Sequence, residues 1–467
     1  MTTIASVEPS TESVRARFDP HSRAAVAAAI ADAEAAFRTW REVPISDRAI
    51  PLRALARILR DHKDRYARLI TTEMGKPITE ALAEIEKCAW NCEFYADHAA
   101  EYLADEFVET NARASYVAFE PLGVILAVMP WNFPFWQVVR FLAPALMAGN
   151  AALLKHASNV PQCALAIEKA VRDAGFPSGL LRTLLLSGAE VEPVIADDRV
   201  RAVTLTGSTA TGARIAELAG RAVKKAVLEL GGSDPFIVLR DADIPAAAET
   251  ATKARFQNAG QSCIAAKRFL VEAPVADEFE RRFGDAIRAL RVGDPFDPAT
   301  QVGPLAREDL RDALERQLAE SVRMGARVVV GGRPRAGKGW FYEPTLLADV
   351  TEDMPVLKEE TFGPVAALLR VRDADEAVRV ANSSPYGLGA ALWTKDEAAA
   401  RRLARRIESG SVFINGMVAS DPRLPFGGVK KSGYGRELSS FGIREFVNVQ
   451  TIWVGPAEQP PQVANVE

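Results

Sequence analysis

The residues best suited to chemistry lie in three short segments that are far apart in the chain. QNAGQSC ends in Cys263, LELGGSDP carries Glu229 at the end of an apolar run, and MPWNFPFW carries Asn132 between prolines and aromatic residues. A cysteine thiolate is a nucleophile when a base or a lowered pKa activates it. A carboxylate can be that base, and an asparagine amide can stabilise an oxyanion. Together these residue types suit attack on a carbonyl carbon.

Each segment also has an ordinary structural interpretation. Cys263 could be a small buried hydrophobic residue, Glu229 a surface glutamate at a strand end, and Asn132 a loop residue that bonds its own backbone. A fourth segment, TLTGSTATG, joins a predicted strand to a helix through Gly207 and Ser208, and its backbone amides could face a pyrophosphate. That segment departs from the G-x-G-x-x-G pattern of dinucleotide sites. The co-occurrence of all four segments therefore carries the functional hypothesis.

The length, composition and charge of the chain exclude several classes of protein. The chain has 467 residues, 48% hydrophobic and 25% charged, with a net charge of −4. This length predicts two or more domains, and the absence of a basic block argues against nucleic acid as a partner. The four histidines and four cysteines show no metal-ligand spacing, so we expect no metal. No signal-type or membrane-spanning apolar run is found, and few cysteines suit a reducing compartment, so we expect a cytoplasmic protein without a membrane partner.

The elements that must position these residues follow two α/β series. The first hundred residues have helical spacing, and short apolar strands then alternate with helices, which predicts a parallel sheet. A second series begins after Gly231. The tail 444–455 alternates like an edge strand, which we expect a subunit contact to cover, and 456–467 is expected to be poorly ordered. The predicted strands of the two series are 123–130, 151–155, 181–186, 202–207 and 225–230, then 235–239, 267–272, 326–332, 364–371, 389–394 and 411–416.

Eight segments together resemble the aldehyde dehydrogenase superfamily, in family order from about Asp19 to Val454. They are PWNFP, LLKHAS, LTGS-x-x-x-G, LELGG, GQSC, EETFGP, NSSPYGL and PFGGVKKSGYGRE. Within the superfamily the chain is similar to short bacterial succinate-semialdehyde dehydrogenases. The resemblance implies an α/β fold with two open α/β domains, a Rossmann-like cofactor domain and a catalytic domain, plus a small β oligomerisation arm. The implied boundaries are 1–112 and 122–230 for the cofactor-binding domain, 231–425 for the catalytic domain, and 113–121 and 445–467 for the arm, with 426–444 returning toward the cofactor domain.

The resemblance also implies a role for each matched position. Cys263 would be the nucleophile, Glu229 the general base, and Asn132 with the backbone N–H of Cys263 the oxyanion hole. The thiolate would add to an aldehyde, a nicotinamide would accept hydride, and water activated by Glu229 would hydrolyse the thioester. Retention of Glu229 favours hydrolysis over acyl transfer to coenzyme A. The implied cofactor-binding residues are Trp131, Lys155, Ser158, Gly207, Ser208, Glu360 and Phe362.

Arg140 bears on the choice of substrate, because it is the only charged residue in FWQVVRFLAPAL. A buried arginine needs a protein acid or an anionic ligand, so an internal salt bridge is one interpretation. The resemblance instead places Arg140 in the substrate funnel with Trp136, Ser262 and Ser420. We therefore expect a semialdehyde that carries a carboxylate, with succinate semialdehyde as the first choice. Glutarate semialdehyde, aromatic or short aliphatic aldehydes, a non-catalytic member of the family and an esterase side activity remain alternatives.

Cofactor preference depends on the sequence KHAS, in which Ser158 stands where an acid would repel a 2′-phosphate. A hydroxyl can donate to that phosphate while Lys155 supplies positive charge. We predict NADP as the preferred cofactor, with NAD accepted. Ser158 could instead cap the helix that starts near Pro161. The implied assembly is a homodimer or a dimer-of-dimers tetramer.

Overall fold

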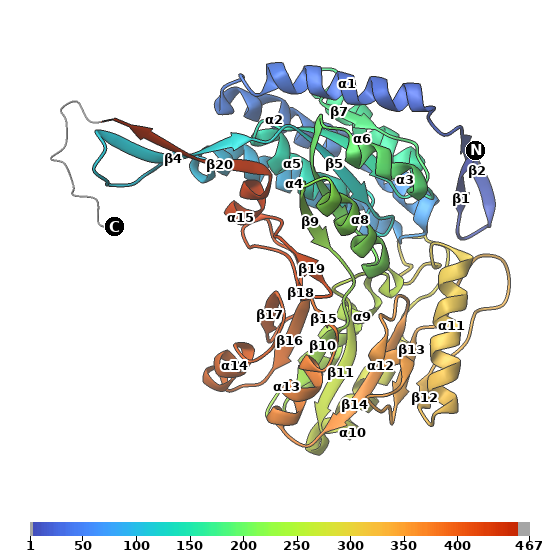
Figure 1. Cartoon of the computed structure of the whole chain (residues 1–467). Helices are drawn as coiled ribbons and strands as arrows, with labels where there is room; N and C mark the ends of the chain where they lie inside the picture. The colour runs from blue at the N-terminus through green and yellow to red at the C-terminus, as the bar shows by residue number, and fades with distance from the viewer. Residues whose placement is uncertain (1–2, 456–467) are drawn as a thin grey trace.

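The computed structural model describes residues 3–455, which form two lobes and a projecting arm (Figure 1). Each lobe is built around one sheet. The strand order is β19-β9-β8-β5-β6-β7 in the first sheet and β12-β13-β14-β11-β10-β16-β17 in the second. This confirms the predicted α/β class with two open sheets. Among residues 3–455, no helix combines the length and apolar character that crossing a membrane requires.

The first sheet gathers four chemically important segments along one edge. Its parallel strands are β5 (Val124–Met129), β6 (Ala151–His156), β7 (Leu181–Thr183), β8 (Val200–Thr206) and β9 (Lys225–Glu229). Every residue of β5 is buried, as the unbroken apolar run predicts for a parallel strand covered on both faces. Parallel strands end at the same edge, where open α/β sheets bind ligands. Asn132, Lys155, Gly207 and Glu229 all lie at or just beyond these carboxyl ends.

Helices cover both faces of this sheet. The longest, α4, follows Pro77 and carries buried residues along its whole length, whereas α5 is buried on all sides. The helix α1 begins where the Ser22 side chain accepts a hydrogen bond from the Ala25 amide at 3.2 Å, an ordinary N-cap. The helices of the lobe are α1 (Arg23–Trp40), α2 (Ile45–Asp61), α3 (Lys63–Met74), α4 (Ile78–Tyr102), α5 (Trp136–Met147), α6 (Pro161–Asp173), α7 (Val191–Ala196), α8 (Thr209–Arg221) and α15 (Ser439–Ile443).

The second sheet presents the opposite ends of its strands to the same junction. The strands β10 (Asp234–Val238), β11 (Ala266–Glu272) and β14 (Val365–Val371) are parallel and begin shortly after Gly232, Cys263 and Phe362. The remaining elements are β12 (Arg327–Val330), β13 (Thr345–Ala348), β16 (Gly389–Trp393), β17 (Ser411–Ile414), α9 (Ile244–Phe256), α10 (Ala273–Arg288), α11 (Glu308–Arg323), α12 (Pro355–Lys358), α13 (Ala374–Asn382) and α14 (Glu397–Ala404).

The arm is a three-stranded antiparallel sheet that extends away from both lobes (Figure 1). In it β4 (Ala114–Pro121) pairs with β20 (Val447–Val454) and with β3 (Glu106–Phe107). The predicted edge strand is therefore β20. The Trp453 side chain is 51% exposed and that of Phe107 is 78% exposed.

Two sequence predictions about these elements were wrong. The first hundred residues are not all helical, because β1 (Ile4–Glu8) and β2 (Ser13–Phe18) form a hairpin whose polar residues mask the alternation. The strand predicted at 181–186 ends at Thr183. The strand β3, which lies within the segment 1–112, pairs with β4 of the arm. Two short antiparallel pieces, β18 (Val429–Lys430) with β15 (Tyr386–Gly387) and β19 (Gly433–Tyr434) with β9, return the chain toward the first lobe. The prediction for 456–467 lies outside the described residues.

Candidate active site

Cys263 lies on a strained loop between α9 and β11. The loop residues Asn258 and Ala259 have φ values of 54° and 52°, and Gly260 follows at 73°. Three successive left-handed residues are uncommon, and such strain persists where the surroundings enforce it. A Cβ at Gly260 would lie 2.3 Å from the Gly363 carbonyl oxygen, so only glycine fits there. The loop is therefore held in one shape against the segment that precedes β14.

Two buried cations hold this loop through its carbonyl oxygens. Arg255 donates to the carbonyls of Gly260, Ala266 and Thr361 at 3.1–3.3 Å and also to that of Gly363. Lys267 donates to the carbonyls of Ser262, Cys263 and Ala265 at 2.8–3.2 Å. Burial lowers the pKa of Arg255 to about 9. Neither residue is predicted from the sequence, although two basic residues among the apolar residues that flank the cysteine loop are a usable signal.

The structure brings Asn132 to the Cys263 loop. Its side-chain Nδ2 donates to the Gln261 carbonyl at 3.1 Å, and its own carbonyl accepts from Asn258 Nδ2 at 2.9 Å. The Asn132 residue is only 5% exposed. An amide NH₂ carries two hydrogens, so one remains free for an oxyanion after the bond to Gln261.

The glycine pair after Glu229 packs against the same loop. A Cβ at Gly232 would lie 2.6 Å from the Cys263 carbonyl oxygen, and a Cβ at Gly231 would lie 2.5 Å from Glu360 Oε2. Any side chain at these positions would displace the cysteine loop or Glu360. The glycines that follow Glu229 in LELGG thus pack against the Cys263 loop and Glu360.

The Cys263 thiol is not activated by a lowered pKa. Burial raises the pKa of Cys263 to about 12, and the positive charges of Lys267 and Arg140 oppose the rise only in part. All four cysteines are free thiols. Of the two routes to a nucleophile, a depressed pKa or a nearby base, these surroundings favour a nearby base.

Glu229 has the environment of a strong base. Both of its carboxyl oxygens are buried without a hydrogen-bond partner among residues 3–455. Burial, reinforced by the charge of Glu437, raises the pKa of Glu229 well above its usual range, against the opposing charge of Arg140. A carboxylate with a raised pKa accepts protons more readily near neutral pH. Arg140 influences the pKa of both Glu229 and Cys263, although no hydrogen bond joins the glutamate to the cysteine in the described chain.

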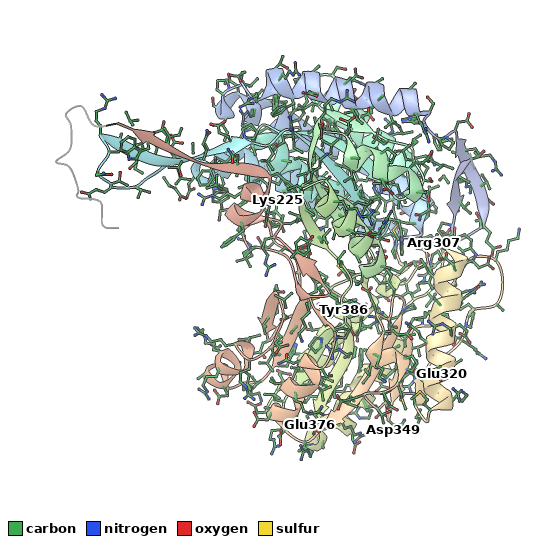
Figure 2. The ribbon with its side chains drawn as sticks, in the orientation of Figure 1. Lys225, Arg307, Glu320, Asp349, Glu376 and Tyr386 are labelled. Atoms are coloured by element: carbon green, nitrogen blue, oxygen red, sulfur yellow. The ribbon has the colours of Figure 1, made fainter. Side chains whose placement is uncertain are left out.

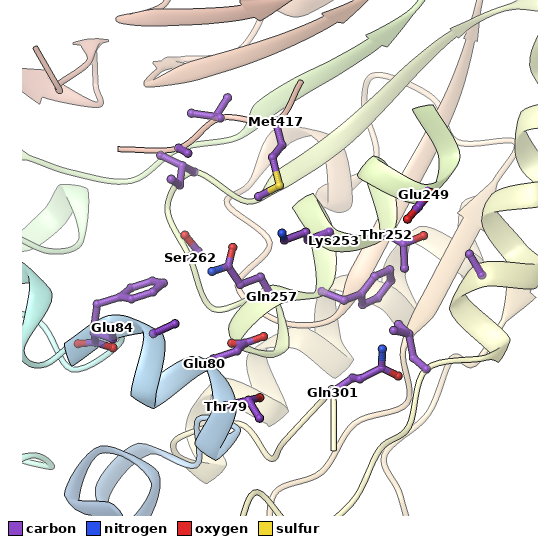
Figure 3. Close-up of a pocket in the computed structure, with 18 of the residues that line it drawn as sticks. Thr79, Glu80, Glu84, Glu249, Thr252, Lys253, Gln257, Ser262, Gln301 and Met417 are labelled. Carbon is purple, nitrogen blue, oxygen red and sulfur yellow. The ribbon is translucent and has the colours of Figure 1, made fainter. Parts of the chain in front are cut away.

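A cavity of about 1020 Å³ opens at Cys263. Figure 3 shows Thr79, Glu80 and Glu84 of α4 on one side of it and Glu249, Thr252 and Lys253 of α9 on another. All four predicted substrate residues, Trp136, Arg140, Ser262 and Ser420, line this cavity together with Cys263. Lys87 of α4, which the sequence did not single out, also lines this cavity, and its Nζ donates to Ser420 Oγ at 2.7 Å.

Arg140 is paired with a protein acid. Its Nε forms an ion pair with Glu437 Oε2, and the two side chains are 2% and 5% exposed. The internal salt bridge, one of the two interpretations that the sequence left open, is therefore present. The hydrogens on Arg140 Nη1 make no hydrogen bond within residues 3–455, so the guanidinium keeps donors at the cavity wall.

The predicted adenosine contacts line a separate cavity of about 540 Å³. Lys155 and Ser158 lie on its wall, and Lys155 forms no ion pair with any carboxylate in residues 3–455. Burial lowers the pKa of Lys155. Ser158 does not cap α6, because the N-cap position is Val160 and no side chain caps it. Glu190 also lines this cavity, but Ser187 holds its carboxylate through two hydrogen bonds.

The remaining predicted cofactor residues lie where the lobes meet. Ser208 caps α8 by accepting from the Thr211 amide at 3.3 Å, so the start of that helix is exposed but its cap is satisfied. The Gly207 amide donates to the Glu229 carbonyl at 2.9 Å. Glu360 accepts from the Gly232 amide at 2.9 Å.

An aromatic pair closes the junction beside Glu360. The rings of Trp131 and Phe362 meet edge to face at 5.8 Å between centroids. Arg307 covers the Trp131 ring at 5.6 Å, and Figure 2 shows Arg307 at the end of α11 that faces the first lobe. Flat hydrophobic faces of this kind suit a planar ring of a cofactor.

Comparison with known proteins agrees with this geometry. The family model described as the aldehyde dehydrogenase family matches residues 1–452. A probable NADP(+) succinate-semialdehyde dehydrogenase of Synechocystis sp. is 52% identical over 97% of this chain and 99% of its own length. An NADP(+) succinate-semialdehyde dehydrogenase of Mycobacterium ulcerans is 51% identical over 97% of this chain and its entire length.

The fold of this chain is also similar to that of a solved structure. The crystal structure of succinic semialdehyde dehydrogenase from Streptococcus pyogenes in complex with NADP+ superposes with a TM-score of 0.95 at 40% identity, covering 97% of this chain and 100% of that one. The family match, the identities and the superposition all extend over nearly the whole chain. The chain belongs to the aldehyde dehydrogenase family.

Proposed function

We propose that this protein oxidises succinate semialdehyde to succinate with NADP through a thioester on Cys263. The observation that carries the proposal is one cavity that contains the free thiol of Cys263 together with Arg140, Ser262 and Ser420. Positive charge and hydroxyl donors at a distance from a nucleophile suit a small aldehyde whose other end is a carboxylate. The names of the two curated relatives support the same substrate and cofactor.

The chemistry follows from the environments of three residues. Glu229, the proposed general base, takes the Cys263 proton and passes it to solvent, because burial disfavours spontaneous ionisation of that thiol. The second amide hydrogen of Asn132 and the Cys263 backbone N–H stabilise the oxyanion that forms on the aldehyde oxygen. Glu229, with its raised pKa and unpaired oxygens, then removes a proton from the water that hydrolyses the thioester. Loss of one oxyanion donor typically costs about 10²–10³ in rate.

The residues present suit a phosphorylated dinucleotide. A bound nicotinamide supplies the acceptor for the aldehyde hydride. Lys155 is a cation without an acid partner beside the Ser158 hydroxyl, and this pair would hold a 2′-phosphate. Gly207 and Ser208 would lie beside the pyrophosphate, Glu360 would hold the nicotinamide ribose, and Trp131 and Phe362 would flank the ring. These assignments make NADP the preferred cofactor and NAD an accepted one.

Each segment of the chain has a proposed role in cofactor binding, catalysis or subunit assembly. Residues 1–112 and 122–230 would bind the cofactor, 231–425 would carry the catalytic loop, and 113–121 with 445–467 would join subunits. The exposed side chains of Val449, Trp453 and Phe107 on the arm suit burial in a homodimer or a dimer-of-dimers tetramer. A mechanism that needs a free thiol suits the reducing cytoplasm.

Initial rates test this function. We expect kcat/KM for succinate semialdehyde to exceed that for butanal, a neutral aldehyde with the same number of carbons, and NADP to be preferred to NAD. Glutarate semialdehyde and benzaldehyde belong in the same table, because they represent the alternative specificities. Better turnover of a neutral aldehyde, or the absence of turnover with every aldehyde, would overturn the proposal.

A further inference from the structure

Lys87 is held at the wall of the substrate cavity without a charged partner. Its Nζ donates to Ser420 Oγ at 2.7 Å and lies 4.5 Å from the centroid of the Trp136 ring. All three residues line the cavity that contains Cys263. A hydroxyl and an aromatic face position an ammonium group but do not neutralise it.

The two acidic residues near Lys87, Glu84 and Asp421, form ion pairs with other residues. Glu84, one turn away on α4, forms an ion pair with Lys76 and accepts the backbone amides of Phe135 and Trp136. Asp421, in the loop after β17, is paired with Arg423 at 2.6 Å. Within residues 3–455 Lys87 therefore forms no ion pair.

Arg140 does not play the same electrostatic role as Lys87. The Arg140 charge is balanced by the buried carboxylate of Glu437, so an anion that binds only there would face a neutral pair. The Lys87 charge is unbalanced and half-buried at the cavity wall. A poorly hydrated, unpaired cation attracts an anion more strongly than a cation already paired.

We propose that Lys87 is the residue that recognises the carboxylate of the substrate, with Ser420 and Trp136 holding its ammonium group in place. The aldehyde end of the substrate then lies at Cys263, and the carboxylate end lies between Lys87 and the free Nη1 donors of Arg140. This inference rests on the proposed oxidation of a carboxylate-bearing aldehyde and names the residue that selects it.

Lys87→Met tests the inference, because methionine keeps a long unbranched side chain without the charge. We expect KM for succinate semialdehyde to rise roughly ten- to a hundredfold, the range for loss of a charge-assisted hydrogen bond, while kcat/KM for butanal is unchanged. Lys87→Arg should keep most of the preference for the semialdehyde. Lys169→Met is the matched control, because Lys169 is an exposed lysine on α6 that lies outside the residues lining this cavity, and it should leave kcat/KM for both aldehydes unchanged.

A parallel change of KM for both aldehydes with Lys87→Met, or an equal effect of Lys169→Met, would overturn the inference. Unchanged butanal kinetics also show that Lys87→Met is folded, and Lys87→Gln provides a second neutral variant. Inhibition of butanal oxidation by succinate separates this inference from the proposed function. If Lys87 binds carboxylates, Lys87→Met weakens that inhibition even when succinate semialdehyde is not the preferred aldehyde. Equal inhibition of both proteins would contradict it.

Discussion

Arg140 and Glu437 form an ion pair between α5 and the loop before α15, with 2% and 5% of their side chains exposed. The pair lies beside Glu229, whose pKa is raised by burial and by the charge of Glu437, against the opposing charge of Arg140. It therefore sets the charge around the proposed general base, besides joining the C-terminal loop to the first lobe.

Removal of one partner of this pair should destabilise the protein strongly. We expect Arg140→Ala to lower the free energy of unfolding by about 3–5 kcal/mol, because it leaves Glu437 buried without a counter-charge. Adding Glu437→Gln should restore part of the loss, since the amide removes the uncompensated charge. Urea denaturation of both single variants and the double variant measures the coupling. A double variant that is as unstable as the sum of the two single variants would show that the pair is not coupled.

Arg140→Ala should also change substrate preference. If the Nη1 donors reach the carboxylate, KM for succinate semialdehyde rises more than KM for butanal. Equal effects on both aldehydes would leave Arg140 with a structural role only.

The preference for the semialdehyde should depend on pH through Lys87. Burial, with the nearby charge of Arg140, lowers the pKa of Lys87 to about 8, against the opposing charges of Cys88, Asp421 and Glu84. The ammonium is charged below that pH and neutral above it. The ratio of kcat/KM for succinate semialdehyde to that for butanal should therefore fall as pH rises through about 8.

In this ratio, the pH dependence that comes from groups acting on both aldehydes, such as Cys263 and Glu229, cancels. Lys87→Arg is the control, because arginine stays protonated in proteins and should remove the alkaline fall. A ratio that does not vary with pH in the unmodified protein would contradict the proposed role of Lys87.

The sequence was sufficient to predict most strands of the two sheets and to select the segments of the proposed site, but it did not predict the charges around them. Apolar runs such as 124–129 identify buried parallel strands without reference to the rest of the chain, and GQSC, LELGG and PWNFP identify the reacting groups by type. The partner of Arg140 is Glu437, almost three hundred residues later, and no local pattern links them. Lys87 was missed for a related reason, since one lysine in the charged helix α4 looks like a solvated residue until the fold places it beside Ser420.

The reactivity of Cys263 should follow its raised pKa. Burial raises this pKa to about 12, whereas an ordinary thiol has a pKa of about 8.5. Alkylation of Cys263 by iodoacetamide should therefore keep accelerating with pH after a reference thiol has levelled off. Cys88, Cys92 and Cys163 are fully buried and should not react in the folded protein, so peptide mapping separates the sites. A plateau of the Cys263 rate near neutral pH would show a thiolate stabilised by its surroundings.

Cofactor preference should respond to charge beside Lys155. Ser158→Asp places a carboxylate where the 2′-phosphate is proposed to bind, and repulsion of about 1–2 kcal/mol would weaken NADP binding roughly tenfold while NAD is retained. Glu190→Gln is the opposite control, because it removes a negative charge from the wall of the same cavity. It should favour NADP. If the ratio of kcat/KM with NADP to kcat/KM with NAD is unchanged in both variants, the 2′-phosphate does not bind beside Lys155 and Ser158.

The most direct test of the central claim is to trap the acyl-enzyme in Glu229→Gln. An amide cannot take the proton from water, so we expect a burst of NADPH that is stoichiometric with active sites, followed by slow turnover. Intact mass and peptide mapping should then locate a succinyl group on Cys263. Turnover of Glu229→Gln at the unmodified rate, or a burst without an adduct on Cys263, would contradict a mechanism in which Cys263 carries the thioester and Glu229 activates the water.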